Sequence, residues 1–185
     1  MELAKGYAVS EPDLVTRARQ GEPQAWAQIY EEFYDRIYRF VFFKMGDQGQ
    51  AEDLSSQVFL KAIESGGSFH WRGVPISAWL FRIARNLVID HQRRAASQRR
   101  YLRLEAAHNS PSTAEEDALR SLQHQEVRQA VAQLTPTQQD VINLRFSAGL
   151  STAETAQALN KSQGAVKALQ HSALVNLRRI MATEP

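Results

Sequence analysis

The apolar residues of this 185-residue chain recur at spacings of three and four, and they nowhere alternate over a sustained stretch. Such spacings place side chains on one face of an α-helix, whereas half-buried strands require alternation. The pattern therefore predicts an all-α fold. A long helix is expected from Pro23 onward, because proline suits a first helical turn. Its predicted buried stripe consists of Trp26, Ile29, Tyr30, Phe33, Ile37, Phe40 and Val41.

Breaks in the helical pattern divide the chain into two small domains. In the first, one helix is expected to end at Gly21, another to run from about Gln50 to Ser65, and a further helix to begin near Ile76. Residues 96–118 contain proline, serine, threonine and an acidic cluster but lack a long apolar stripe, which is typical of a flexible linker, partly helical at its start. The prediction is a first domain over 1–95, a linker over 96–118 and a second domain over 119–185.

The second domain has the pattern of a helix-turn-helix. The segments TPTQ at 135–138 and STAE at 151–154 each fit a capping box that opens a helix. A turn follows, and Ser162 caps a last helix that runs through Met181. A short helix, a tight turn and a longer helix after two supporting helices are typical of this DNA-binding motif, although ordinary helical hairpins share the outline.

The last predicted helix separates into two faces when its residues are projected at 100° steps. The face expected to pack on the domain core carries Val166, Leu169, Ala173, Leu177 and Ile180. The opposite face carries Gly164, Lys167, Ala168, His171 and Arg178, with Gln163 near the amino end. It combines small residues, which permit close approach, with side chains able to reach base edges or phosphates in a major groove. Arg178 and Arg179 also suit the C-terminal end of the helix dipole without any DNA.

Positive charge concentrates in residues 67–103, which hold eight Lys/Arg against one acid although the whole chain carries a net charge of only +2. Such a block attracts phosphates, while a solvated helix face or a basic linker is the alternative explanation. The outer side of the helix within this block carries Arg82, Arg85, Asn86, Ile89 and Arg93. Asn86 adds a side chain able to make paired hydrogen bonds to a base edge.

A loop rich in aromatic residues precedes that helix, with the sequence FHWRGVP at 69–75. The ring of Trp71 can stack on a base that has left the duplex. The alternative is a hydrophobic plug that closes the first domain, which we expect for Phe69 more than for Trp71. The loop and the basic helix together indicate a surface for opened DNA.

The outer side of the predicted helix over residues 51–63 is polar and acidic, unlike that of the basic helix. Ala51, Leu54, Val58 and Ala62 are expected to face inward, and Asp53, Ser56, Gln57, Leu60 and Glu64 to face outward. An exposed leucine ringed by polar and acidic groups suits a protein partner better than DNA, although single exposed leucines are common.

Several classes of protein are disfavoured by composition. The chain has no cysteine, which excludes disulfides and thiolate metal sites and fits a reducing cytoplasm. No apolar run approaches the roughly 20 residues that span a bilayer, and no signal peptide is present near the N-terminus. The five histidines are scattered, and no nucleophile elbow, phosphate loop or paired metal-ligand spacing occurs. We therefore expect a soluble, cytoplasmic protein that is no enzyme and holds no metal or cofactor.

Three segments carry a family resemblance: AEDLSSQVFLKAI at 51–63, AWLFRIARNLVIDHQRR at 78–94 and LTPTQQDVINLRFSAGLSTAETAQALNKSQGAVKALQHSALVNLRRI at 134–180. In order and spacing they resemble the extracytoplasmic-function (ECF) sigma factors, the smallest group of the sigma-70 family. The resemblance implies a bacterial transcription initiation factor that binds core RNA polymerase and directs it to promoters.

The resemblance also implies three contact surfaces. The clamp helices of the largest polymerase subunit would bind Asp53, Ser56, Gln57, Leu60 and Lys61. The non-template strand of the downstream (−10) promoter element would bind His70, Trp71, Arg72, Trp79, Arg82, Arg85, Asn86 and Arg93. The duplex upstream (−35) element would bind Ser162, Gln163, Gly164, Ala165, Lys167, Ala168, His171 and Arg178.

Further partners follow from the same resemblance. The flap of the second-largest polymerase subunit would be a second contact, and an anti-sigma factor would hold the protein inactive. Leu169 and Ser172 stand where arginine is common in the family, so we expect modest affinity for upstream DNA. A conventional helix-turn-helix regulator without sigma activity is the main alternative, but it leaves the aromatic loop and the basic helix without a role.

Overall fold

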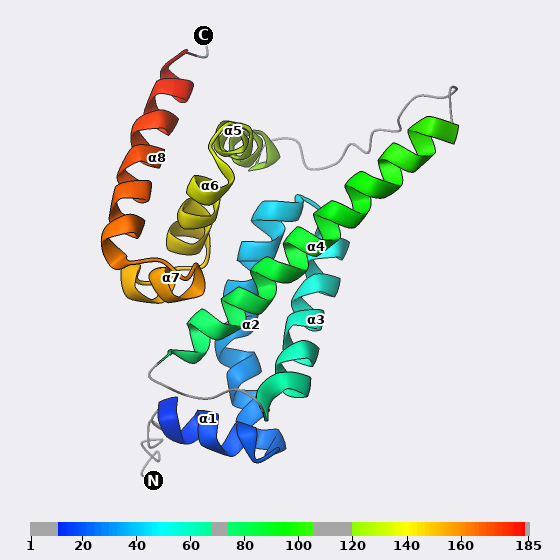
Figure 1. Cartoon of the computed structure of the whole chain (residues 1–185), viewed down its shortest axis with the longest axis vertical. Coiled ribbons are helices and arrows are strands. Elements are labelled where there is room, and N and C mark those ends of the chain that lie inside the picture. Colours follow the sequence, from blue (N-terminus) through cyan, green and yellow to red (C-terminus); the bar gives the residue numbers. More distant parts are fainter. Residues whose placement is uncertain (1–10, 68–73, 106–119, 184–185) are drawn as a thin grey trace.

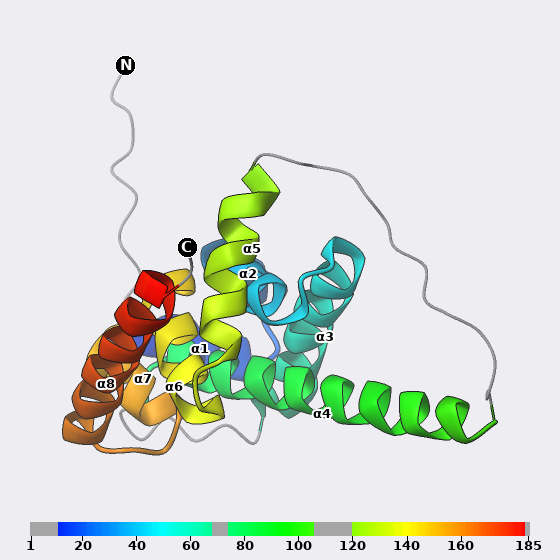
Figure 2. The same cartoon turned by 90° about the horizontal axis from the view of Figure 1, so that it is seen from above.

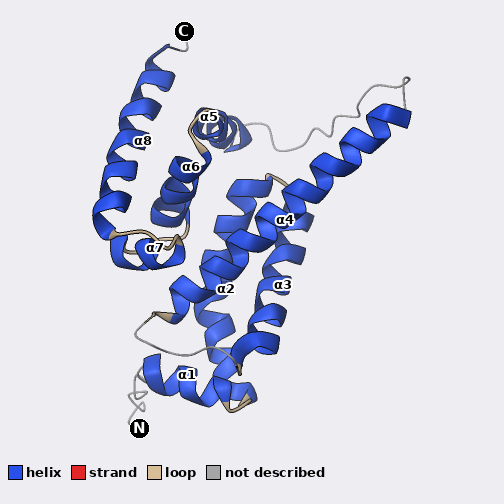
Figure 3. Ribbon diagram, in the orientation of Figure 1, coloured by secondary structure: helices blue, strands red, loops and turns tan. Residues whose placement is uncertain are grey.

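The computed structural model describes residues 11–67, 74–105 and 120–183, and within these ranges it is helical, with short loops and no strand (Figure 3). The elements are α1 (Glu11–Arg19), α2 (Pro23–Met45), α3 (Gln48–Gly66), α4 (Ile76–Glu105), α5 (Arg120–Ala132), α6 (Pro136–Ile142), the π-helical turn η1 (Asn143–Ser147), α7 (Thr152–Ala158) and α8 (Gln163–Thr183). The predicted all-α fold with a helix-turn-helix in its second half is confirmed.

Helices α1 to α4 form the first domain, in which α4 packs across α2 and α3 (Figure 1). The connection from α2 to α3 follows from local sequence: Gly46 ends α2 in a left-handed conformation (φ 73°), and the Asp47 side chain accepts a hydrogen bond from the Gln50 amide at 2.8 Å. The second half of α4 extends beyond the other helices of this domain (Figure 2). Because α4 continues to Glu105, the start of the expected linker is helical.

The predicted buried stripe of α2 is confirmed at most of its positions: Ile29, Phe33, Ile37, Phe40 and Val41 are all buried. Trp26 is half-buried. Tyr30 is 42% exposed, so the prediction was wrong there. Its ring lies at the edge of the interface between α2 and α3, where it stacks on Tyr34 at a centroid distance of 4.9 Å and packs against Phe59 at 4.7 Å.

The second domain begins its helices where the sequence predicts. Both capping boxes are present: Thr135 pairs with Gln138 at the start of α6, and Ser151 with Glu154 at the start of α7. The Ser162 hydroxyl accepts a hydrogen bond from the Ala165 amide at 3.1 Å and caps α8. The π-helical turn η1 was not foreseen, because a single wide turn leaves no mark on apolar spacing.

The second domain packs directly on the first. Leu144, Ala148, Leu150 and Ala158 are buried in the same apolar cluster as Phe40 and Phe81 of the first domain. In Figure 1, α7 lies beside the first turns of α4. The two domains therefore share part of one core, an arrangement that the division into domains and linker did not predict.

A shared core predicts that the domains unfold together. Leu144 is fully buried, so Leu144→Ala should lower the free energy of unfolding by about 2–5 kcal/mol. All three tryptophans lie in residues 1–95, and so their fluorescence reports on the first domain alone. We expect the urea midpoint of this fluorescence to fall for Leu144→Ala and to change little for Leu174→Ala, whose side chain is 44% exposed. An unchanged midpoint for Leu144→Ala would show that the domains are uncoupled.

Candidate nucleic-acid and protein interfaces

The outer face of α8 is open to solvent, as its periodicity predicts. Val166 and Ala173 are fully buried at 0% exposure, and Leu169, Leu177 and Ile180 are half-buried on the same side. The opposite side presents seven exposed predicted DNA-binding residues, Ser162, Gln163, Gly164, Lys167, Ala168, His171 and Arg178, and the half-buried Ala165. The structure thus brings the predicted −35 residues together on one accessible helix face.

The outer face of α3 is likewise accessible. Asp53, Ser56, Gln57, Leu60 and Lys61 are all exposed, and Leu60 is exposed to 60%. The predicted inward residues Ala51, Leu54, Val58 and Ala62 are buried. The residues proposed for polymerase therefore share one surface.

A row of aromatic rings on α2 adjoins this surface, and sequence reasoning missed it. Tyr30, Tyr34, Tyr38 and Phe42 follow at intervals of four residues and stack in succession, at centroid distances of 4.9, 6.4 and 5.8 Å. Burial, reinforced by Tyr30 and Glu52, raises the pKa of the Tyr34 phenol. The four-residue spacing was the signal in the sequence, since it places rings one above another on a helix.

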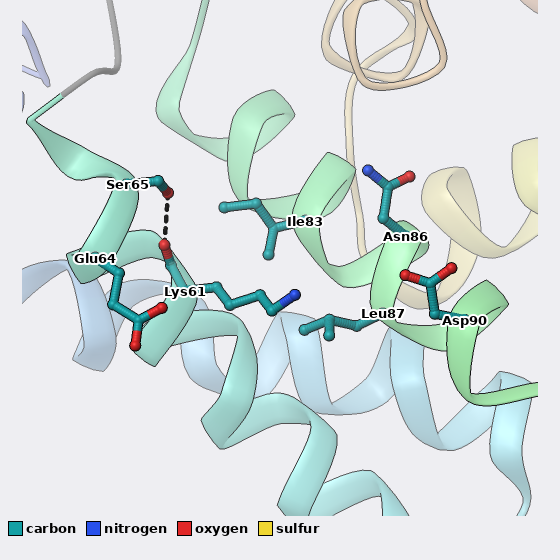
Figure 4. A pocket seen from close by; sticks show the side chains of 7 residues that line it. All are labelled: Lys61, Glu64, Ser65, Ile83, Asn86, Leu87 and Asp90. Carbon is teal, nitrogen blue, oxygen red and sulfur yellow. Dashed lines mark hydrogen bonds between the residues drawn. The ribbon is translucent and has the colours of Figure 1, made fainter. Parts of the chain in front are cut away.

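A groove between α3 and α4 borders the outer face of α3 at Lys61 (Figure 4). Lys61 and Glu64 line it from α3, while Asn86 and Asp90 line it from α4, and Leu87 lies between them. Asn86 is exposed, so its amide is accessible to a ligand at the rim of the groove.

The two arginines predicted to share the outer side of the helix with Asn86 contact the second domain. Arg82 donates a hydrogen bond to the Gln157 carbonyl at 2.8 Å, and Arg85 Nε donates to Asp140 Oδ2 at 2.7 Å. The helical projection was correct about their direction away from the first domain's core. It did not predict their partners, because the projection of one helix contains no information about a second domain packed on it.

The remaining predicted −10 residues are distributed differently. Arg93 is exposed. Trp79 is half-buried and packs against the apolar core, which makes it a supporting residue in this structure. His70, Trp71 and Arg72 lie outside the described residues.

Asp140 occupies the centre of the contact between the domains. Its side chain is only 7% exposed, and its two carboxylate oxygens pair with different cations of the first domain. Oδ1 lies 2.7 Å from Lys44 Nζ of α2, and Oδ2 lies 2.7 Å from Arg85 Nε of α4. A buried carboxylate requires such partners, because an unpaired charge in this environment is strongly unfavourable.

Further hydrogen bonds surround this pair. Arg36 and Arg39 of α2 donate to the carbonyls of Ala148 at 2.9 Å and Ser147 at 3.2 Å, just at the end of η1. Exposed carbonyls at a helix C-terminus carry partial negative charge, which favours cations. The Asn143 side chain, buried within η1, donates to the Phe40 carbonyl at 2.9 Å. The first domain thus supplies cations to the negative groups of the second.

Glu154 adds a contact at the start of α4. Its carboxylate accepts a hydrogen bond from the Ser77 hydroxyl at 2.6 Å, and it also closes the capping box of α7. Burial raises the pKa of Glu154, but the hydrogen bonds from Ser77 and Ser151 and the charge of Arg36 outweigh burial, so that its pKa lies below the usual value.

Within the described residues, no group of histidine and acidic side chains is arranged to hold a metal ion, and no helix is long and apolar enough to cross a membrane.

Two family models match the chain in the order of its domains. Sigma-70 region 2 matches residues 29–98, and Sigma-70 region 4 matches residues 130–179. The first match includes α3 and most of α2 and α4, and the second includes α6, α7 and most of α8. The fold and these matches define the chain as a protein of the sigma-70 class.

Individual relatives show to which group within the sigma-70 class the chain belongs. The ECF RNA polymerase sigma factor BldN of Streptomyces coelicolor is 38% identical over 176 residues, which cover 91% of this chain and 65% of BldN. The ECF RNA polymerase sigma factor SigX of Bacillus subtilis is 33% identical, with 83% of this chain and 81% of SigX covered. The chain therefore belongs to the ECF RNA polymerase sigma factors, which are transcription initiation factors, and the resemblance noted in its sequence is confirmed.

Solved structures show the same fold at lower identity. CnrH, determined in complex with the cytosolic domain of CnrY, superposes with a TM-score of 0.74 at 21% identity, covering 95% of this chain and 99% of CnrH. The sigma factor RpoE of Bartonella quintana, in complex with the anti-sigma factor NepR, superposes with a TM-score of 0.66 at 22% identity, covering 88% of this chain and 99% of RpoE.

The lowered pKa of Glu154 predicts a pH-dependent contribution to stability. A carboxyl group whose pKa is depressed in the folded state stabilises that state above its unfolded pKa, and the contribution is lost as pH falls through the folded pKa. Glu154→Gln should therefore lower the free energy of unfolding by about 0.5–1 kcal/mol at pH 7, and this deficit should shrink below about pH 4.5. Urea titrations at pH 7 and at a pH below about 4.5 measure this difference in the free energy of unfolding, with the exposed Glu31→Gln as control. A deficit that does not change with pH would contradict the assignment.

Proposed function

We propose that this chain starts transcription by holding core RNA polymerase through α3, the opened −10 strand through α4 and the −35 duplex through α8. The observation that carries the proposal is the order of the two family matches, region 2 on the first domain and region 4 on the second. A protein with both regions can connect polymerase to two promoter elements at once.

For polymerase, the proposed contact is the outer face of α3 with the adjoining edge of α2. Leu60, Ile63 and Tyr30 are exposed to 60%, 50% and 42%, and polar or acidic side chains surround them. Exposed apolar groups within a polar rim are typical of protein interfaces. The partner is the pair of clamp helices of the largest polymerase subunit, and the second domain contacts the flap of the second-largest subunit.

For the −10 strand, the proposed surface is the outer side of α4. Asn86 reads a base, while Arg82, Arg85 and Arg93 contact phosphates. The roles of His70, Trp71 and Arg72 rest on the sequence, in which rings and a guanidinium precede the basic helix. Trp79 supports this surface through its packing against the core.

For the −35 duplex, the proposed reading element is α8, with Gln163, Lys167 and His171 directed into the major groove. Gly164 and Ala168 are exposed between them and allow the helix to approach the bases. The half-buried Leu169 contributes no charge, which supports the expected modest affinity.

Regulation by an anti-sigma factor is part of the proposal. RpoE of Bartonella quintana, which shares the fold, was determined with such a factor bound. In this chain the accessible faces of α3 and α8 are the surfaces that an inhibitor has to cover. We place this activity in the cytoplasm, where polymerase and DNA are found.

Reconstitution with core RNA polymerase tests the proposal. The purified chain should form a complex with core polymerase and support run-off transcription from promoter fragments of its own host. A conventional helix-turn-helix regulator, the alternative, would bind duplex DNA without core polymerase and would start no transcript. Failure to bind core polymerase would reject the sigma assignment for this chain.

Replacement of Leu60 tests the polymerase surface. Because Leu60 is exposed, Leu60→Asp should leave the helical circular dichroism signal intact while it weakens binding to core polymerase by about tenfold or more. The exposed Leu174→Asp on α8 is the matched control, since it introduces the same charge away from this surface. Equal affinity of Leu60→Asp and the parent for core polymerase would remove α3 from the interface.

Replacement of two α8 residues tests the upstream surface. Lys167→Ala should weaken binding of the holoenzyme to duplex promoter DNA and reduce the salt slope by about one, because one phosphate contact is lost. His171→Ala should alter base preference at one position. A template with a preformed downstream bubble should be less affected, and equal losses on both templates would instead indicate damage to the fold.

A further inference from the structure

The contact between the domains covers part of the proposed −10 surface. Arg82 and Arg85 of α4 are both occupied by groups of the second domain, a carbonyl of α7 and the carboxylate of Asp140. Ser77, in the first turn of α4, is 3% exposed, and its hydroxyl donates a hydrogen bond to the Glu154 carboxylate. In this arrangement Arg85 Nε is engaged by Asp140, and one terminal guanidinium nitrogen of Arg82 is engaged by the Gln157 carbonyl.

Asp140 offers the arginine the same chemistry as DNA does. A carboxylate and a phosphate each present anionic oxygens to a guanidinium, and both form charge-assisted hydrogen bonds with it. The 2.7 Å distance from Arg85 Nε to Asp140 Oδ2 is that of such a bond. Lys44 Nζ holds the other carboxylate oxygen at 2.7 Å, so the anion is gripped from α2 and from α4.

We propose that Asp140 is an intramolecular substitute for a DNA phosphate, which keeps the α4 surface closed in the free chain until DNA displaces it. This inference rests on the proposed role of Arg82 and Arg85 in binding the −10 strand. Promoter DNA and Asp140 then compete for one arginine, and release of Asp140 allows the second domain to move away from α4.

The two proposed nucleic-acid surfaces therefore differ in accessibility. The hydrogen bonds to Ser77, Arg82 and Arg85 of α4 come from α6 and α7, whereas the outer face of α8 remains exposed. The closed chain is therefore competent to meet duplex DNA through α8 but not to capture an opened strand through α4. This closure prevents the free chain from binding unrelated single-stranded DNA before its second domain moves away from α4.

The ion pair between Arg85 and Asp140 has properties that suit a reversible closure. The side chain of Arg85 is 35% exposed, so water and salt reach its pair with Asp140. A partly exposed ion pair contributes modestly and is weakened by screening. Polyanionic DNA brings many phosphates to the same arginines, which favours exchange of the single carboxylate.

The test measures domain separation and DNA binding in the same full-length protein. Because the natural chain has no cysteine, Gln28→Cys on α2 and Leu174→Cys on α8 provide two exposed sites for a fluorescent donor and acceptor. The DNA probe is a single-stranded oligonucleotide of mixed sequence, since phosphate contacts do not depend on sequence. Energy transfer reports on closure, and titration with the probe gives affinity.

Asp140→Asn should lower energy transfer without DNA and raise affinity for the probe by about three- to tenfold, the range expected for loss of one partly exposed ion pair. The exposed Asp35→Asn is the matched control, because it changes net charge equally but lies outside the contact. Lys44→Gln removes a partner of the same carboxylate, so it should also lower energy transfer. Agreement between the two variants shows that the effect is not a fold defect specific to Asp140→Asn. Adding the probe to the parent protein should lower its energy transfer.

The possible results distinguish failure of this inference from failure of the proposed function on which it rests. If neither Asp140→Asn nor Lys44→Gln changes energy transfer or affinity relative to Asp35→Asn, Asp140 does not close the α4 surface and the inference is wrong. If Asp140→Asn opens the chain but Arg85→Ala on that background leaves probe affinity unchanged, the proposed DNA role of α4 is wrong. Opening combined with an Arg85-dependent gain in affinity supports both.

Discussion

A carboxylate buried to 7% exposure must be paired, and Asp140 is paired with cations of the other domain. This requirement fixes α6 against both α2 and α4. With α6 in place, Leu144, Ala148 and Leu150 enter the core of the first domain, and the carbonyls that follow η1 meet Arg36 and Arg39. The remaining contacts between the domains thus lie around one ion pair network.

The same network connects the fold to the function of the family. An ECF sigma factor has to engage polymerase and two promoter elements, and the surfaces proposed for these tasks in this chain differ in accessibility. The outer faces of α3 and α8 are exposed, whereas Arg82 and Arg85 on α4 are engaged by the second domain. Binding through the accessible faces comes first in this account, and capture of the opened strand follows separation of the domains.

Local features were predictable from the sequence, because apolar spacing and capping residues act within one helix. The faces of α3 and α8 and the capping boxes at Thr135 and Ser151 follow from such rules. The partners of Arg85 and Lys44 did not, since Asp140 lies 55 and 96 residues away in sequence. One signal was available: an acidic residue beside Val141 and Ile142 at a buried position requires a cation from elsewhere in the fold.

Opening of the domains during initiation is the central claim, and a covalent tether tests it directly. Arg39 and Phe146 are exposed, line one cavity between the domains and are not among the residues proposed to bind DNA or the polymerase clamp helices. Arg39→Cys and Phe146→Cys in one chain, joined by a short bifunctional thiol reagent, hold the domains together. The account predicts that the tethered chain loses run-off transcription with core polymerase, while the same variant treated with a monofunctional reagent retains it. Equal transcription by both samples would contradict the account.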